Sequence, residues 1–144
     1  MTVVEGHGLP IGLLVFSAQP HESRLAQATL ATISVPRAIG RPRTRPQRLV
    51  ADKAYDNRAF RQYLRRRGIA CTIPNYRRHF QTKPRRGRPI RVGEAYQQRW
   101  KVERCFAWMD NCRRLVVRYE RTILMYRAFC ILAFILWSVN SFLK

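Results

Sequence analysis

The chain has 144 residues, which is enough for one domain with a modest core. Its hydrophobic fraction of 47% and aromatic fraction of 11% exclude a disordered tail. Its 28 basic and 8 acidic residues leave a net charge of +20, so the chain needs a polyanionic partner, most commonly nucleic acid.

The N-terminal third is expected to hold a strand hairpin and a helix. Residues 1–4 read as a strand, residues 5–8 as a turn, and residues 11–16 (IGLLVF) as a short apolar strand. Apolar residues at helical spacing predict a helix over residues 22–33. Residues 35–47 (VPRAIGRPRTRPQ) have no periodicity, and they predict a loop that is either solvated or in contact with phosphates.

The central segment predicts a strand, a helix and a second strand. Residues 48–51 are the first strand and residues 69–73 the second. Between them Asp56 is expected to cap a helix over residues 57–67, with Gly68 as the residue that ends it. Because such a crossover is right-handed, the two strands are expected to be parallel.

The C-terminal half predicts a loop and two helices. Residues 76–91 form a second loop rich in Arg and Pro, with a solvated or a DNA-contacting role. Residues 93–118 follow a helical pattern, and residues 122–142 predict a more apolar helix. The apolar run 128–143 is short for a membrane span and contains polar residues, so it predicts a buried helix and no membrane partner.

Neither the cysteines nor the first residues indicate secretion or a zinc site. The 4 cysteines include no C-x-x-C pair and no zinc-like spacing to histidine, which favours reduced core cysteines. The opening MTVVE lacks the basic start and apolar core of a signal peptide. A cytoplasmic protein is therefore expected.

Because the chain holds only 8 acids, the position of each is informative. Asp52 directly follows an apolar strand, at the edge where open α/β sheets commonly bind ligands, although for this residue taken alone a turn-forming role is the favoured interpretation. On an ideal helix, a polar stripe about 60° wide holds Tyr96, Arg99, Glu103 and Asp110. The stripe predicts either a site at the rim of the sheet or a solvated face with an Arg99–Glu103 ion pair.

These acids lie in motifs that resemble those of bacterial insertion-sequence transposases, most closely the insertion-sequence type five group. The spacing Tyr96-x-x-Arg99-x-x-x-Glu103 resembles the Tyr, Arg and Glu of the family's YREK signature. The segment ADKAYD, which contains Asp52, looks like the one that holds the family's second catalytic Asp. The stretches 8–23 and 118–129 are similar to the family's GLP region and C-terminal region.

The resemblance implies an α/β fold with an RNase H-like mixed sheet, closed by C-terminal helices. In that family, two Asp and one Glu hold divalent ions, usually Mg²⁺ (or Mn²⁺), for phosphodiester hydrolysis and strand transfer on DNA. By resemblance, Asp52 and Glu103 would be catalytic residues and metal ligands. Tyr96 and Arg99 would grip phosphates of the element's ends.

The sequence departs from the family pattern in two places. It has no Asp before Asp52 to match the family's first catalytic Asp. Residues 1–144 are therefore expected to be a single C-terminal portion of the catalytic domain, which is incomplete at the N-terminus. This portion is expected to be inactive alone. An upstream-frame polypeptide would supply the missing Asp, and a homodimer on DNA is expected. Asp110 stands where the signature has Lys, so Arg113 and Arg114 are expected to supply the positive charge.

Two other interpretations stay open at this point. A non-catalytic basic nucleic-acid-binding protein would explain the charge but not the co-occurrence of the motifs. A small membrane-associated basic protein would use the apolar C-terminal run.

Overall fold

A computed structural model describes residues 1–16, 22–75 and 93–143, so the predicted loop 76–91 lies outside the described residues. The strands are β1 (Thr2–Val4), β2 (Pro10–Leu13), β3 (Arg48–Val50) and β4 (Ala70–Thr72). The helices are α1 (Glu22–Ala31), α2 (Arg58–Arg66), α3 (Trp100–Met109), α4 (Arg113–Val116) and α5 (Ile123–Phe142), with the 3₁₀ helices η1 (Lys53–Tyr55) and η2 (Glu94–Arg99).

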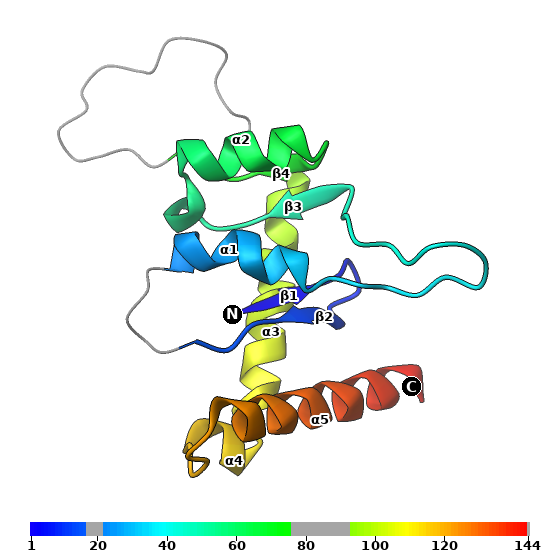
Figure 1. The fold of residues 1–144 in the computed structure, drawn as a ribbon, viewed down its shortest axis with the longest axis vertical. Coiled ribbons are helices and arrows are strands. Elements are labelled where there is room, and N and C mark those ends of the chain that lie inside the picture. The colour runs from blue at the N-terminus through cyan, green and yellow to red at the C-terminus, as the bar shows by residue number, and fades with distance from the viewer. Residues whose placement is uncertain (17–21, 76–92, 144) are drawn as a thin grey trace, which may run out of the picture.

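The described strands pair into two two-stranded sheets (Figure 1). β1 and β2 are antiparallel, as expected for a hairpin, although β2 ends at Leu13 and not at residue 16. The turn between the two strands contains Gly8, whose φ of 96° is a conformation that favours glycine. β3 and β4 are parallel, which confirms the predicted strand–helix–strand unit and the mixed α/β class. β3 and β1 are the inner strands of the four in Figure 1.

A shared apolar core joins the two sheets. α1 and α2 line it with residues at helical spacing, and residues on either side of β4 complete it: Ala26, Leu30, Ile33, Phe60, Leu64, Ile69 and Ile73 are all buried. Val3 of the first sheet and Leu49 of the second both pack against this cluster. The two sheets are therefore held in one body by side chains, although no ladder of backbone hydrogen bonds joins them in the described residues.

The start of α2 differs from the prediction. Asn57 is the N-cap, since its side chain accepts a hydrogen bond from the Ala59 N–H at 2.8 Å. The expectation that Asp56 caps the helix was wrong, because its carboxylate accepts from Arg61 Nε at 2.7 Å. Arg61 Nη2 also donates to the Ile73 carbonyl at 2.8 Å, so this buried pair ties α2 to the chain beyond β4.

The helix predicted over residues 93–118 is three segments. It starts as the 3₁₀ helix η2, continues as α3, and is interrupted before the short α4. At the interruption Asp110 ends α3, and the Cys112 N–H donates to the Met109 carbonyl at 2.9 Å. The Asn111 side chain competes for a backbone carbonyl of α3, that of Ala107, at 3.3 Å. Such local bonds from a polar side chain favour the end of a helix over its continuation.

The long C-terminal helix is confirmed, with Thr122 as its N-cap, but its predicted burial was wrong. Cys130, Ala133 and Phe134 are buried, and Cys130 and Phe134 form an apolar cluster with Cys105 and Met109 of α3. The other faces of α5 are exposed, because α3 covers only one stripe of a helix that is apolar all round. By length and composition alone, this helix could also cross a membrane.

Candidate active site

Asp52 lies at the carboxyl end of β3, as predicted, and also caps the turn that follows. Its Oδ1 accepts the N–H of Lys53 at 2.6 Å, so η1 starts at this carboxylate. Its Oδ2 accepts no hydrogen bond from the described residues. The side chain is half-buried. One oxygen therefore performs the turn-forming role, while the other remains available to a ligand.

Tyr96, Arg99 and Glu103 form a continuous chain of contacts. Arg99 Nη2 lies 2.8 Å from Glu103 Oε1, and its Cζ lies 6.0 Å from the centre of the Tyr96 ring. The side chains of the ion pair are 37% and 55% exposed. Glu103 is thus more solvated than the predicted place at the rim of the sheet implied, and the pair itself contributes about 1 kcal/mol or less.

α3 and η2 connect this chain of contacts to both sheets. η2 contacts β3, which leads to Asp52, and α3 contacts β1. Lys101 Nζ donates to the Gly6 carbonyl and so fastens α3 to the turn between β1 and β2. On the face of α3 opposite Glu103, burial raises the pKa of the Cys105 thiol to about 11, as suits an unreactive core residue.

Glu5, the acid nearest the N-terminus, belongs to a turn. Its Oε1 accepts the N–H groups of His7 and Leu9 at 2.7 and 3.2 Å, and its Oε2 lies 3.0 Å from His7 Nδ1. Although burial alone would raise it, the pKa of Glu5 is lowered by these hydrogen bonds. Both oxygens of Glu5 are therefore used within the turn between β1 and β2.

The residues expected to replace the signature Lys lie beyond α3. Asp110 is exposed at its end, and Arg113 is exposed on α4. Arg114 Nη1 lies 3.4 Å from Glu120 Oε1 and its Cζ lies 5.4 Å from the centre of the Phe129 ring. Arg114 therefore helps to hold α4 on α5, while its side chain stays 65% exposed.

The same helix carries an aromatic and basic surface that the sequence patterns did not indicate. The Trp100 ring is 47% exposed, and the Arg104 guanidinium lies 5.8 Å from its centre. Arg104 also lies 6.0 Å from the centre of the Trp137 ring on α5. The i,i+4 spacing of Trp100 and Arg104 is the signal that could have revealed it, since exposed aromatic rings beside arginine suit nucleic-acid bases.

The described carboxylates do not make a complete metal site by themselves. No three His, Cys, Asp or Glu side chains in residues 1–16, 22–75 and 93–143 lie close enough together to hold a metal ion. Hard divalent cations prefer several oxygen ligands. Asp52 and Glu103 are carboxylates, the donor type that such cations prefer, but two carboxylates alone are a small ligand set.

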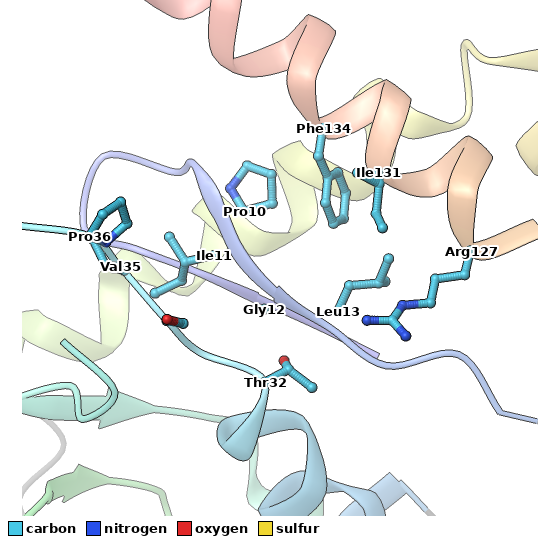
Figure 2. A pocket seen from close by; sticks show the side chains of 11 residues that line it. Pro10, Ile11, Gly12, Leu13, Thr32, Val35, Pro36, Arg127, Ile131 and Phe134 are labelled. Atoms are coloured by element: carbon cyan, nitrogen blue, oxygen red, sulfur yellow. The ribbon is translucent and has the colours of Figure 1, made fainter. Parts of the chain in front are cut away.

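A pocket of about 390 Å³ lies away from these acids, between β2 and α5 (Figure 2). Pro10 and Leu13 on the strand face Ile131 and Phe134 on the helix, with Arg127 at one end. The described residues that line this pocket include no carboxylate. Its apolar walls suit packing against protein better than they suit phosphodiester chemistry.

Comparisons with known proteins agree on one family. Residues 1–138 match the model of the family "Transposase DDE domain". Over 128 residues the chain is 30% identical to a Burkholderia cepacia protein named as a transposase for insertion sequence element IS402. The match covers 88% of this chain and 56% of the relative, so the chain spans about half the relative's length. No solved structure matches the chain significantly.

Proposed function

This chain belongs to the DDE transposase domains of insertion sequences, and from that premise we propose that it forms part of an enzyme that cleaves and rejoins DNA at an element's ends. The observation that supports the proposal most is the chain of contacts from Tyr96 through Arg99 to Glu103. These residues lie on η2 and α3; η2 contacts β3, the strand that precedes Asp52, and α3 contacts β1. The assignment to the insertion-sequence type five group stays a prediction.

In the proposed site Asp52 and Glu103 are the catalytic carboxylates and the ligands of Mg²⁺ or Mn²⁺. DDE transposase domains generally use such divalent ions, which activate a nucleophile and stabilise the leaving oxygen when bound. Arg99 and Tyr96 bind a phosphate of the element's end. Because the Arg99–Glu103 pair is exposed, breaking it costs little, and the guanidinium can turn to a DNA phosphate. Arg113 and Arg114 add positive charge further along.

The open edges of the sheets support an RNase H-like arrangement that is completed by another segment. In a ladder, alternate residues turn their peptide groups toward one neighbour. In the first sheet, the backbone of Met1 is hydrogen-bonded to that of Leu14, so the peptide groups of the next residue, Thr2, point to the outer edge of β1. In the second sheet, the peptide groups of Arg48 and Val50 point away from β4 for the same reason. These peptide groups have no hydrogen-bond partner among the described residues.

We infer that an extended segment pairs with β1 and β3 and carries the third carboxylate beside Asp52. It would convert the two small sheets into one mixed sheet, of which residues 1–144 are a single C-terminal portion. A polypeptide encoded upstream is the proposed source. The chain joined to that polypeptide is called the completed enzyme below.

The isolated chain is expected to be inactive, because two carboxylates fall short of the ligand set. Purified protein incubated with labelled duplex DNA and Mg²⁺ or Mn²⁺ should release no more product than its Asp52→Asn variant. The completed enzyme should cleave. Cleavage by the isolated chain that the Asp52→Asn change removes would refute the incomplete-site proposal.

We propose a homodimer that forms through α5. In a chain of charge +20, residues 123–142 contain one Arg and no acid, so two copies meet there with the least repulsion. Several large apolar side chains of this helix are exposed: Leu124 (74%), Leu132 (55%), Leu136 (58%) and Phe142 (78%). Exposed apolar surface of this extent marks an interaction site.

Light scattering and carbonate extraction test this surface. The protein is expected to remain in the cytoplasmic supernatant and to have the mass of a dimer. The exposed Leu132→Glu and Leu136→Glu changes should give a folded monomer, whereas Ser141→Glu, which is exposed half a turn around the helix from Leu132, should leave the dimer intact. A monomeric wild type would contradict the proposal. A chain that pellets with membranes would also contradict it, and would favour a membrane-associated protein.

The alternative is a non-catalytic basic nucleic-acid-binding protein. The charge and the exposed Trp100–Arg104 surface fit it equally well. The two functions differ in the completed enzyme, because only a transposase depends on Asp52 and Glu103 for a chemical step.

A further inference from the structure

Residues 35–43 form an arm that projects from the body between α1 and β3 (Figure 1). Val35 and Arg43 close its base with two backbone hydrogen bonds, of 2.9 and 2.7 Å. At its tip Gly40 has φ 89°, which reverses the chain at little steric cost. The predicted loop is therefore a narrow arm of two chain segments that run side by side. Pro36 and Pro42 restrict the backbone φ angle, one in each segment.

The base of the arm is fixed to the end of α2. Arg45 Nη1 donates to the Arg67 carbonyl at 3.0 Å, and Arg67 Nη2 donates in return to the Thr44 carbonyl at 3.2 Å. A Cβ on Gly68 would lie 3.1 Å from Arg45 Nη1, so glycine leaves the room that this guanidinium occupies. Arg45 and Arg67 thus hold the base of the arm in place, and the arginines on the arm itself are available to a partner.

The tip combines positive charge with one exposed apolar side chain. Ile39 is 90% exposed, the most exposed large hydrophobic residue in the part of the chain that the structure describes. Arg37 and Arg41 flank it and are exposed too. Residues 34–47 contain no acid. Another copy of this basic chain would be repelled here, whereas a polyanion with apolar surface between its charges would fit.

We propose that the arm binds duplex DNA, with Arg37 and Arg41 on phosphates and Ile39 wedged against a base step, which it partly unstacks. Apolar wedges beside arginines act in this way in proteins that enter the minor groove. The inference rests on the proposed DNA-handling function and adds a contact distant from the chemistry. The arm leads through residues 44–47 to the amino end of β3, whereas Asp52 follows the carboxyl end of that strand.

Fluorescence of 2-aminopurine placed in a short A·T-rich duplex tests the wedge, because this base brightens when it is unstacked. The full chain is expected to raise the fluorescence at saturation. Ile39→Ala should remove at least half of the rise and weaken binding by about tenfold. Arg37→Ala and Arg41→Ala should each lower the salt slope of binding by about one. Phe16→Ala, an exposed apolar change beyond the end of β2, should alter neither.

The outcomes separate this inference from the function on which it rests. Wild-type DNA binding with fluorescence and affinity unchanged in Ile39→Ala would overturn the wedge and leave the proposed function standing. A chain that binds no DNA at all would overturn both. Binding to phosphatidylserine vesicles that depends on Ile39, with duplex binding that does not, would overturn the proposal in favour of a lipid surface.

Discussion

Replacing Glu103 by Gln in the completed enzyme is expected to slow cleavage of an element's end on the order of 10²–10³-fold or more, with little change in DNA affinity. Gln keeps the size of the side chain and removes its negative charge, which is what a divalent cation requires of this ligand. The change should not unfold the protein, because Glu103 is 55% exposed and its described ion pair is the one with Arg99.

Glu94→Gln is the matched control, since Glu94 is an exposed acid on η2, the neighbouring segment of the same helical run. It should leave the cleavage rate within about twofold of wild type, as expected for a surface substitution. Single-turnover rates at saturating DNA separate chemistry from binding. Equal rates for Glu103→Gln and Glu94→Gln would remove Glu103 from the reaction and favour the non-catalytic alternative.

DNA binding by the chain is expected to fall steeply with salt. If six to ten phosphates are contacted, the dissociation constant should rise about 10³–10⁵-fold between 50 and 200 mM salt. The arginines expected to carry this effect are exposed in the structure and form no described ion pair: Arg37, Arg41, Arg43, Arg48, Arg58, Arg65, Arg66 and Arg113.

Fluorescence anisotropy over a salt series measures the slope. Arg65→Gln combined with Arg66→Gln should reduce it by about two, one for each lost phosphate contact. A double change of Gln62 and Gln97, two exposed and uncharged residues, to Ala is the matched control and should leave it unchanged. A slope close to zero would mean that the charge of the chain serves something other than DNA.

Local patterns were sufficient to predict most elements in the first half of the chain. The unit from β3 to β4 follows from two short apolar runs around a helix that ends at Gly68, whose φ of 65° only glycine adopts freely. The cap of α2 was mispredicted because Asp56 and Asn57 are both good caps. Arg61, about one turn into α2, decides between them because it binds the Asp56 carboxylate and leaves Asn57 as the cap.

The C-terminal half was less predictable because its errors concern tertiary structure. Periodicity shows that residues 123–142 form an apolar helix, yet it does not show how many neighbours surround it. The interruption at Asn111 depends on a competing side-chain bond that helical propensity does not reveal. For the candidate site, the i,i+4 relation of Arg99 and Glu103 was predictable, whereas the double use of Asp52 as cap and candidate ligand was not.

The central claim is that Asp52 and Glu103 act together on one reaction, although they lie on separate elements. The most direct test is a double-mutant cycle on the cleavage rate of the completed enzyme, with Asp52→Asn, Glu103→Gln and both together. Residues that act as a unit are strongly non-additive, so the double variant is predicted to be no slower than the slower single variant. Effects that multiply, or a single variant that cleaves like wild type, would contradict the claim.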